Sequence, residues 1–368
     1  MAPQLIGTRI RALREDRALT QDQLADRLGF KDRQTLSAIE TGDRRLTAEE
    51  LLLAAKVLGA SLETLTDPFL LIGEGRFSWR QTGTPPARLF AYERDAGCWI
   101  AAYRTLAAQQ GHRPPLDRRA LRLSKASSFE DAIAAGERFS DDHKLGQVPA
   151  LRLPSVMQDA FDILLLMVDA IPGVSGAACR LPELDSVLIN RQEIAGRRHF
   201  DLAHELFHVL TWDSMPPDHI ETAAESGGSR VEQLANNFAS AVLMPKDVLA
   251  RFGAWSGLTG DGLIQKLNQT ADTLAVTASA LKWRLVQMGQ LTLKTARSLD
   301  EARLRNNGHA APPKDAPALF SKPFLGVIAR ALDEGQLSIR RAASLLGVDI
   351  DAMPDLFAAQ GITAEIGI

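Results

Sequence analysis

The feature that most restricts the fold of this chain is a group of ionisable residues inside an apolar helical segment. Residues 197–212 read RRHFDLAHELFHVLTW, and His204, Glu205 and His208 lie among positions that are apolar on nearly every side. We expect such a helix to be buried. Because an unpaired buried charge is very costly, these three groups require a partner inside the protein. A bound metal ion meets that requirement most simply.

The spacing of the two histidines supports a metal site. At positions i and i+4, the imidazoles of His204 and His208 project from one face of a helix and can bind one Zn²⁺ ion. Glu205 can then reach a metal-bound water as general base. One alternative is that both histidines are buried core residues whose hydrogen bonds are made by other protein groups, with no metal. The other is a purely structural zinc site. Structural sites favour cysteine ligands, and the two cysteines here, Cys98 and Cys179, form no CxxC motif.

A catalytic zinc site needs a third protein ligand. Glu232 lies on the next apolar helical segment, residues 229–245, in a stripe with the small residues Ala235 and Ala239 that would let the two helices approach closely. We favour Glu232 because a rigid helix holds a ligand better than a loop does. Asn236, one turn later, is predicted either to orient a ligating histidine or to serve helix packing. The polar loop between the two segments offers the rival carboxylates Asp213, Asp218, Glu221 and Glu225.

These segments resemble the ImmA/IrrE family of zinc-dependent metallopeptidases. The similar motifs are GRRHFDLAHELFHVL and ExxAxxFAxAxLMP, and the resemblance covers about residues 128–250. The stretch VSGAACRLPELDSVLIN (174–190) resembles the short β-hairpin of that family, in which an edge strand lines the cleft. The resemblance implies a zincin-like core that cleaves a peptide bond of a repressor or partner protein. It implies His204, His208 and Glu232 as metal ligands and Glu205 as the base.

One feature departs from what a protease needs. The two tyrosines, Tyr92 and Tyr103, both lie outside the region that resembles the peptidase family. No tyrosine is therefore in place to stabilise an oxyanion. The candidates that remain are His199, His219 and Arg198, although each of them is a stronger candidate for a surface or structural residue.

The N-terminal sequence contains a second pattern. Thr20 and Gln23 have the spacing of a capping box at the start of a short helix that ends at Gly29, and Asp32 can cap a second short helix after a tight turn. Two such helices form a helix-turn-helix, whose second helix presents its N-terminal side chains to the major groove. Residues 1–66 hold ten basic and ten acidic residues, and some helix-turn-helix units serve only packing or dimerisation. We nevertheless favour specific DNA binding.

This segment resembles the lambda-repressor-like, or XRE-type, helix-turn-helix domain over about residues 4–66. The matching stretches are TQDQLA (20–25), the Gly29 turn, SAIETG (37–42) and AEELLLAAKVLGASLETL (48–65). The resemblance implies that Gln21 anchors a phosphate, that Arg44 touches the DNA backbone, and that four residues face the bases: Arg33, Gln34, Thr35 and Ala38. Arginine reads guanine and glutamine reads adenine through paired hydrogen bonds, which agrees with these roles.

Composition restricts the class of protein further. Hydrophobic residues make up 45% of the chain and charged residues 24%, as in ordinary globular proteins, and the net charge of −3 provides no basic field over the whole chain. The longest apolar run, residues 163–168, is far too short to span a membrane. The N-terminus lacks the apolar stretch of a signal peptide. We therefore expect a cytoplasmic protein that contacts no membrane.

Glycine and proline positions indicate how the chain is divided. We expect a helix-turn-helix domain at 1–69, a helical connector at 70–127, a metallopeptidase-like domain at 128–300, a Pro-rich linker at 301–323 and a helical tail at 324–368. The predicted fold class is mainly α. It comprises a five-helix lambda-repressor-like domain, an α+β zincin-like domain with a small β-hairpin or sheet, and the helical tail. We expect the tail to pack on the core or to form a dimerisation arm, with a second DNA-contacting unit as the alternative.

Three functions remain open at this point. The chain is a DNA-bound zinc metalloprotease that cuts a repressor or itself, a repressor or antitoxin whose metal domain binds a ligand or toxin without turnover, or a protease that the helix-turn-helix merely localises. The intact Glu205 favours turnover, and the Arg33–Gln34 pair argues against the third function. The expected cofactor is Zn²⁺. The expected partners are operator double-stranded DNA, a protein substrate or toxin, and a second copy of the chain in a homodimer.

Overall fold

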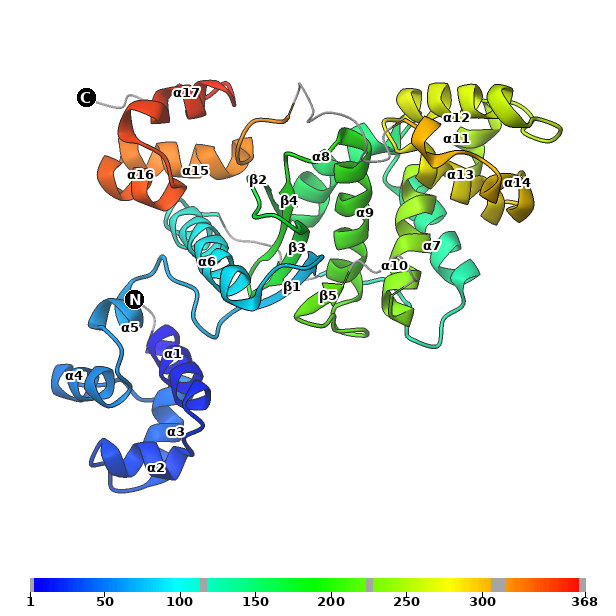
Figure 1. The fold of residues 1–368 in the computed structure, drawn as a ribbon. Coiled ribbons are helices and arrows are strands. Elements are labelled where there is room, and N and C mark those ends of the chain that lie inside the picture. Colours follow the sequence, from blue (N-terminus) through cyan, green and yellow to red (C-terminus); the bar gives the residue numbers. More distant parts are fainter. Residues whose placement is uncertain (1–2, 113–117, 223–227, 306–315, 364–368) are drawn as a thin grey trace.

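The computed structural model describes residues 3–112, 118–222, 228–305 and 316–363 (Figure 1). The first part of the chain forms a domain of five helices: α1 (Pro3–Asp16), α2 (Gln21–Arg27), α3 (Arg33–Thr41), α4 (Ala48–Val57) and α5 (Leu62–Thr66). A separate apolar core that includes Ile10, Leu24 and Leu36 holds these helices together. The five-helix N-terminal domain of the predicted fold class is confirmed.

Local capping explains where the two central helices of this domain begin and end. The Thr20 hydroxyl accepts a hydrogen bond from the Gln23 amide, and the Gln23 side chain accepts one from the Thr20 amide, which completes the predicted capping box. The chain leaves α2 through Gly29, whose φ of +71° is a left-handed conformation that glycine adopts without strain. The Asp32 carboxylate then accepts from the Thr35 amide at the start of α3.

The body of the protein is built around a mixed sheet. Within the described residues it has five strands in the order β2-β4-β3-β1-β5. They are β1 (Arg76–Gln81), β2 (Leu164–Val168), β3 (Val174–Arg180), β4 (Asp185–Asn190) and β5 (Ile220–Thr222). The strands β3 and β4 pair antiparallel and form the predicted hairpin, β1 runs antiparallel to β3, and the pairs β2–β4 and β1–β5 are parallel.

The expectation that an edge strand of this hairpin lines the cleft is wrong. Both hairpin strands are interior, because β2 pairs with the outer side of β4 and β1 with the outer side of β3. The reason lies in residues 70–127, which contribute a strand as well as a helix. Phe77 and Trp79 alternate along β1 and form its apolar face. This face is buried beneath α6 (Pro86–Gln109) when β1 pairs with the sheet.

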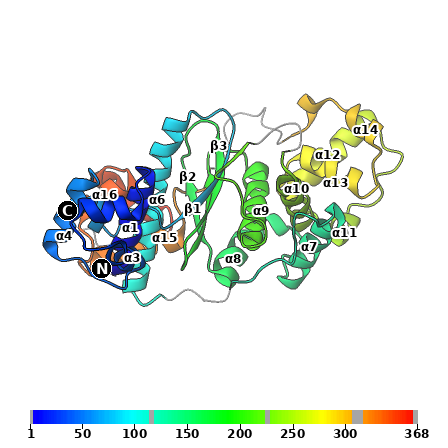
Figure 2. The ribbon, with the colours of Figure 1, turned by 90° about the horizontal axis from the view of Figure 1, so that it is seen from below.

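Helices cover both faces of the sheet (Figure 2). One face carries α8 (Pro149–Phe161) and α9 (Ala195–Thr211); α10 (Arg230–Leu243) packs on α9, and α7 (Phe129–Asp142) packs on α10. The other face carries α6 together with α15 (Lys322–Asp333), α16 (Ile339–Leu346) and α17 (Met353–Ala358). Side chains alternate between the two apolar cores along β2, β3 and β4; in β4, Val187 and Ile189 face α9 and Leu188 faces α6.

The C-terminal helices pack on α6. The Trp99 indole donates to the carbonyl of Leu345 at 2.9 Å, and the Gln110 amide donates to the carbonyl of Val327 at 2.9 Å. These contacts hold α15 and α16 against α6. The predicted C-terminal tail is therefore helical, and it packs on the body of the protein. Of the predicted Pro-rich linker, residues 306–315, with Pro312 and Pro313, lie outside the described residues.

Four further helices cap the body beyond α10: α11 (Lys246–Ala250), α12 (Gly260–Leu274), α13 (Ala278–Gln287) and α14 (Leu293–Arg297). Short 3₁₀ turns follow at Glu301–Arg303 and Ile350–Ala352. In the described part of the chain, no helix is both long enough and apolar enough to cross a membrane.

Candidate metal centre and DNA-contacting helix

Helix α9 is buried along the turns that carry the HExxH motif. It lies between the sheet on one side and α10 on the other (Figure 2). Gly196 allows the N-terminus of α9 to lie against the backbone of Val276, because a Cβ at this position would be only 2.5 Å from that backbone. His204 and His208 have no exposed surface, and Glu205 is 1% exposed. The sequence-based expectation of a buried helix is therefore met.

Three candidate ligands converge on one point. The Nε2 atoms of His204 and His208 lie 3.0 Å apart, and the Glu232 carboxylate places Oε2 3.3 Å from the first and Oε1 3.1 Å from the second. Ligand atoms bonded to zinc at 2.0–2.1 Å in a tetrahedron lie roughly 3.3 Å apart. The donor set and its spacing thus fit a zinc ion. Within the described residues, these three form the one group of at least three histidine, cysteine or acidic side chains close enough to hold a metal.

A hydrogen bond from α10 orients the first histidine. The Nδ1 atom of His204 lies 3.0 Å from Oδ1 of Asn236, so we assign the ring proton to Nδ1, which leaves the Nε2 lone pair directed at the cluster. Burial, and next the positive charge of Arg80, lower the pKa of His204 to about 3. The ring is therefore neutral at physiological pH, which is the form that binds metals.

Two of the four rival carboxylates in the loop after α9 can be placed, and both lie elsewhere. Asp213 is 84% exposed and pairs with Arg180 at 3.2 Å, and Asp218 is exposed. Glu225 and the side chain of Glu221 lie outside the described residues. The geometry thus brings Glu232 to the two histidines, and it places Asp213 and Asp218 away from them.

The base candidate, Glu205, packs against a glycine of the sheet. A Cβ on Gly176 of β3 would lie 3.8 Å from Cγ of Glu205 and 2.9 Å from the carbonyl oxygen of Leu188. Only a residue without a side chain leaves this space open. Gly176 therefore allows α9, and with it the Glu205 carboxylate, to lie close to the strand.

A charged residue that the sequence analysis did not identify lies beside the candidate metal site. Nε of Arg80 on β1 is 3.3 Å from Oδ1 of Asp201, which precedes His204 by one turn of α9. The side chain of Arg80 is 14% exposed and that of Asp201 is 2% exposed. The alternation of Phe77 and Trp79 places Arg80 on the opposite face of β1. The sequence analysis did not predict a strand here, so this signal was not used.

The three residues named as candidates for oxyanion stabilisation are engaged outside the cluster. His199 donates from Nδ1 to the carbonyl of Ala275 at 2.7 Å, and burial lowers the pKa of its ring. Nη1 of Arg198 donates to the backbone carbonyls of residues 191 and 193. His219 bonds to the Glu93 carboxylate on α6 at 2.6 Å.

The first two turns of α3 carry the predicted base-contacting side chains. Arg33 and Gln34 are exposed, while Thr35 and Ala38 are half-buried. The Thr35 hydroxyl donates to the capping carboxylate of Asp32 at 3.0 Å, so this side chain already serves the helix start. Arg33 and Gln34 are the pair best placed to reach a ligand.

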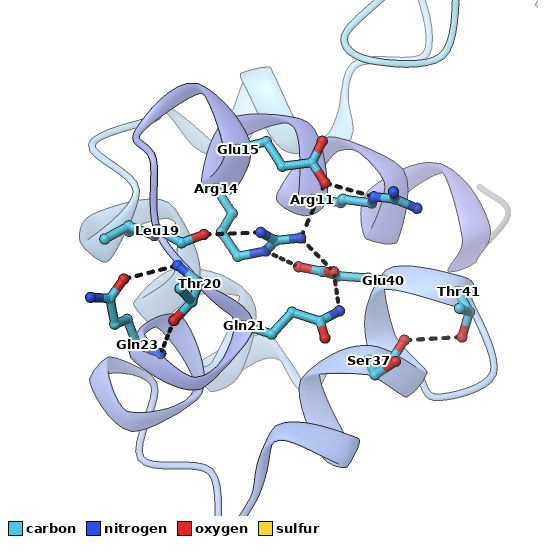
Figure 3. A network of polar contacts seen from close by, with 10 residues as sticks. All are labelled: Arg11, Arg14, Glu15, Leu19, Thr20, Gln21, Gln23, Ser37, Glu40 and Thr41. Atoms are coloured by element: carbon cyan, nitrogen blue, oxygen red, sulfur yellow. Dashed lines mark hydrogen bonds and ion pairs between the residues drawn. The ribbon is translucent and has the colours of Figure 1, made fainter.

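A buried polar network orients the predicted phosphate-contacting residue (Figure 3). The Gln21 amide donates to Glu40 at 2.8 Å, and Glu40 also accepts from Nε and Nη2 of Arg14 at 2.6 and 3.0 Å. The predicted backbone contact, Arg44, pairs with Glu50 at 2.6 Å and lies over the Phe30 ring. This pairing raises the pKa of Arg44 and lowers that of Glu50.

Comparisons with known families match two separate parts of the chain. Residues 10–65 match the family model of the helix-turn-helix, and residues 176–256, from β3 to just beyond α11, match that of the IrrE N-terminal-like domain, a peptidase family. No curated protein matches the chain. The N-terminal domain is thus similar to XRE-type helix-turn-helix domains, and the sheet with α9 and α10 is similar to the ImmA/IrrE metallopeptidase-like domain.

Proposed function

We propose that this chain is a DNA-binding transcription regulator with a zinc-dependent endopeptidase domain that cleaves a repressor or partner protein, or the chain itself. The observation that carries the proposal is the convergence of His204, His208 and Glu232, with Glu205 beside them, on two buried helices. Two imidazoles and one carboxylate leave the fourth position of a tetrahedral zinc ion open, which is the arrangement of catalytic rather than structural sites.

Each residue has a distinct role in the proposed reaction. His204, His208 and Glu232 would hold the metal, and Asn236 fixes the ring of His204 by its hydrogen bond. Zinc, when bound, polarises the peptide carbonyl and activates water at neutral pH. Glu205 takes the proton of the attacking water and then delivers it to the leaving amine. The apolar surroundings of α9 keep bulk water from this carboxylate and strengthen its interactions.

In the same proposal, the N-terminal domain reads an operator. Arg33 and Gln34 enter the major groove from the exposed first turn of α3, and Gln21 holds a phosphate. Its side chain is supported for this role because Glu40 already fixes one end of the carboxamide. We propose binding as a homodimer to two-fold-related half-sites, since one helix-turn-helix unit makes few contacts.

One observation favours a second function, that of a repressor or antitoxin which binds a partner without cleaving it. The two histidine side chains have no exposed surface, and Glu232 bonds both of them. A polypeptide therefore reaches these atoms only if neighbouring segments move. Under this alternative, the metal domain serves as a binding module for a toxin or small ligand.

The test separates the two functions by one side chain. Zinc-loaded wild type and Glu205→Gln are incubated with the product of the neighbouring gene, with and without single-stranded DNA or a small-molecule effector, and fragments are identified by mass spectrometry. We expect fragments with wild type and none with Glu205→Gln at equal zinc content. Absence of fragments under every condition, with equal repression by both proteins, would support the binding module instead.

A further inference from the structure

The inference concerns the outward face of α4 in the five-helix domain. Ala54 and Ala55 of this helix belong to the apolar core of the domain, whereas Leu52 is 54% exposed and Leu53 is 37% exposed. In both views of the ribbon, α4 lies at the outer edge of the molecule, on the side away from the sheet (Figure 1 and Figure 2). Single exposed leucines are common on protein surfaces, so the charges beside this pair decide what it binds.

Two charges of opposite sign flank the leucines. Glu49 comes three residues before Leu52, and Lys56 comes three residues after Leu53, so the four side chains share one stripe along the helix. Both charged side chains are exposed, and neither has an ion-pair partner within the described residues. The remaining charged residue of α4, Glu50, is instead paired inside the domain with an arginine.

The stripe complements itself across a two-fold axis. The midpoint between Leu52 and Leu53 is also the midpoint between Glu49 and Lys56. A two-fold axis perpendicular to α4 at this point places the helix antiparallel to its copy, with each leucine opposite a leucine. Glu49 then lies opposite Lys56 of the partner subunit at both ends of the contact. A two-fold axis parallel to the helix would instead bring like charges together, which is unfavourable.

We propose that α4 is the contact surface between two copies of the chain, packed antiparallel about this axis. The inference deepens the proposed operator binding and rests on it for its role on DNA, because two-fold-related half-sites are read by a dimer. The leucines form an apolar centre, and the two ion pairs at the rim set the register of the helices. The contact is small, so we expect a weak dimer in the absence of DNA.

The first test captures the dimer covalently. A carbodiimide joins a carboxylate to an amine only where the two groups are in direct contact. Within one helix, seven residues separate Glu49 from Lys56 by about 10 Å, which prevents coupling inside a single chain. An equal mixture of unlabelled and isotopically labelled full chain is treated at several protein concentrations. We expect mass spectrometry to detect a Glu49–Lys56 link between one labelled and one unlabelled peptide, with a yield that rises with concentration.

The second test reverses the charges, with dimer dissociation constants measured by sedimentation equilibrium. We expect Lys56→Glu to raise the constant more than about tenfold, because it brings like charges together at both ends of the contact. The double variant Glu49→Lys/Lys56→Glu should regain the wild-type constant, since the swapped charges are again opposite. Leu52→Ser should weaken the dimer and lower the yield of the link. The matched controls, Lys31→Glu and Leu151→Ser, change exposed residues outside α4 and should have no effect.

Three results would overturn the inference: no mixed-label link in wild type, an unchanged constant in Lys56→Glu, or no recovery in the double variant. A dimer that lacks the link would place the contact on another surface, such as the C-terminal tail. The failure of the operator proposal is recognised separately. In that case wild type forms the link through α4 but binds no double-stranded DNA, and the contact between copies stands without an operator.

Discussion

Replacement of Glu40 by alanine should destabilise the DNA-contacting domain far more than any surface charge change. The Glu40 side chain is 2% exposed and that of Arg14 is 9% exposed, and their two hydrogen bonds connect α3 to α1. Removing the carboxylate leaves the buried arginine with only the exposed Glu15 carboxylate and the Leu19 carbonyl as partners, and breaking a buried ion pair in this way costs about 3–5 kcal/mol. The hydrogen bond from Gln21 to this carboxylate adds about 1–2 kcal/mol.

A loss of this size is a large part of the stability of a small domain, which is about 5–15 kcal/mol. Hydrogen exchange of the full chain, followed by mass spectrometry, measures the opening of α1 and α3 without requiring two-state unfolding. We expect protection in these helices to fall roughly 10²- to 10⁴-fold, since about 1.4 kcal/mol corresponds to a factor of ten.

Glu15→Ala is the matched control, because Glu15 is 53% exposed and its ion pairs with Arg11 and Arg14 contribute less than about 1 kcal/mol. The double variant Arg14→Met/Glu40→Leu should regain most of the protection, since it leaves no buried charge. Equal protection in Glu40→Ala and Glu15→Ala would refute the reasoning, because it would mean that the network in Figure 3 adds nothing to the domain.

Three further predictions concern single side chains. Asn236→Ala should weaken zinc affinity about 10- to 100-fold in a competition assay with a chelator, because the ring of His204 loses its orienting bond; unchanged affinity would assign Asn236 to helix packing. Arg33→Ala should cost about 1–3 kcal/mol of operator affinity and relax specificity at one base pair, whereas equal weakening on all sequences would make it a phosphate contact. Burial lowers the pKa of His199 below 6.5, so the unfolded chain binds the extra proton and stability must fall as the pH decreases below about 6.5. His199→Asn, which keeps a donor for the Ala275 carbonyl, should make urea midpoints less dependent on pH in that range, and an unchanged pH dependence would contradict this assignment.

Local chemistry explains which parts of the fold were predictable. The helix starts at Thr20 and Asp32 depend on hydrogen bonds between residues three positions apart, so the sequence alone predicted them. The contact of His204 with His208 depends on helical spacing, and it was predicted in the same way. Such interactions need no knowledge of the distant chain.

The role of β1 was not predictable in this way. Residues 76–81 form a strand because they pair with β3, about a hundred positions later, and because α6 covers Phe77 and Trp79. Neither the pairing with β3 nor the cover by α6 can be predicted from the six residues of this segment alone. The family resemblance led to the expectation of an edge strand of the hairpin at the cleft, and Arg80 was left out of the candidate site.

Zinc binding by wild type and Glu232→Ala, measured as metal content after equilibrium dialysis against buffered zinc, tests the central claim most directly. The control is Gln233→Ala, the next residue on α10. We expect about one zinc ion per chain in wild type and in the control, and a large loss in Glu232→Ala, because Glu232 closes the ligand set at 3.1–3.3 Å from both imidazoles. A wild type that binds no zinc, or a Glu232→Ala variant that keeps the full amount, would contradict the metal centre described here.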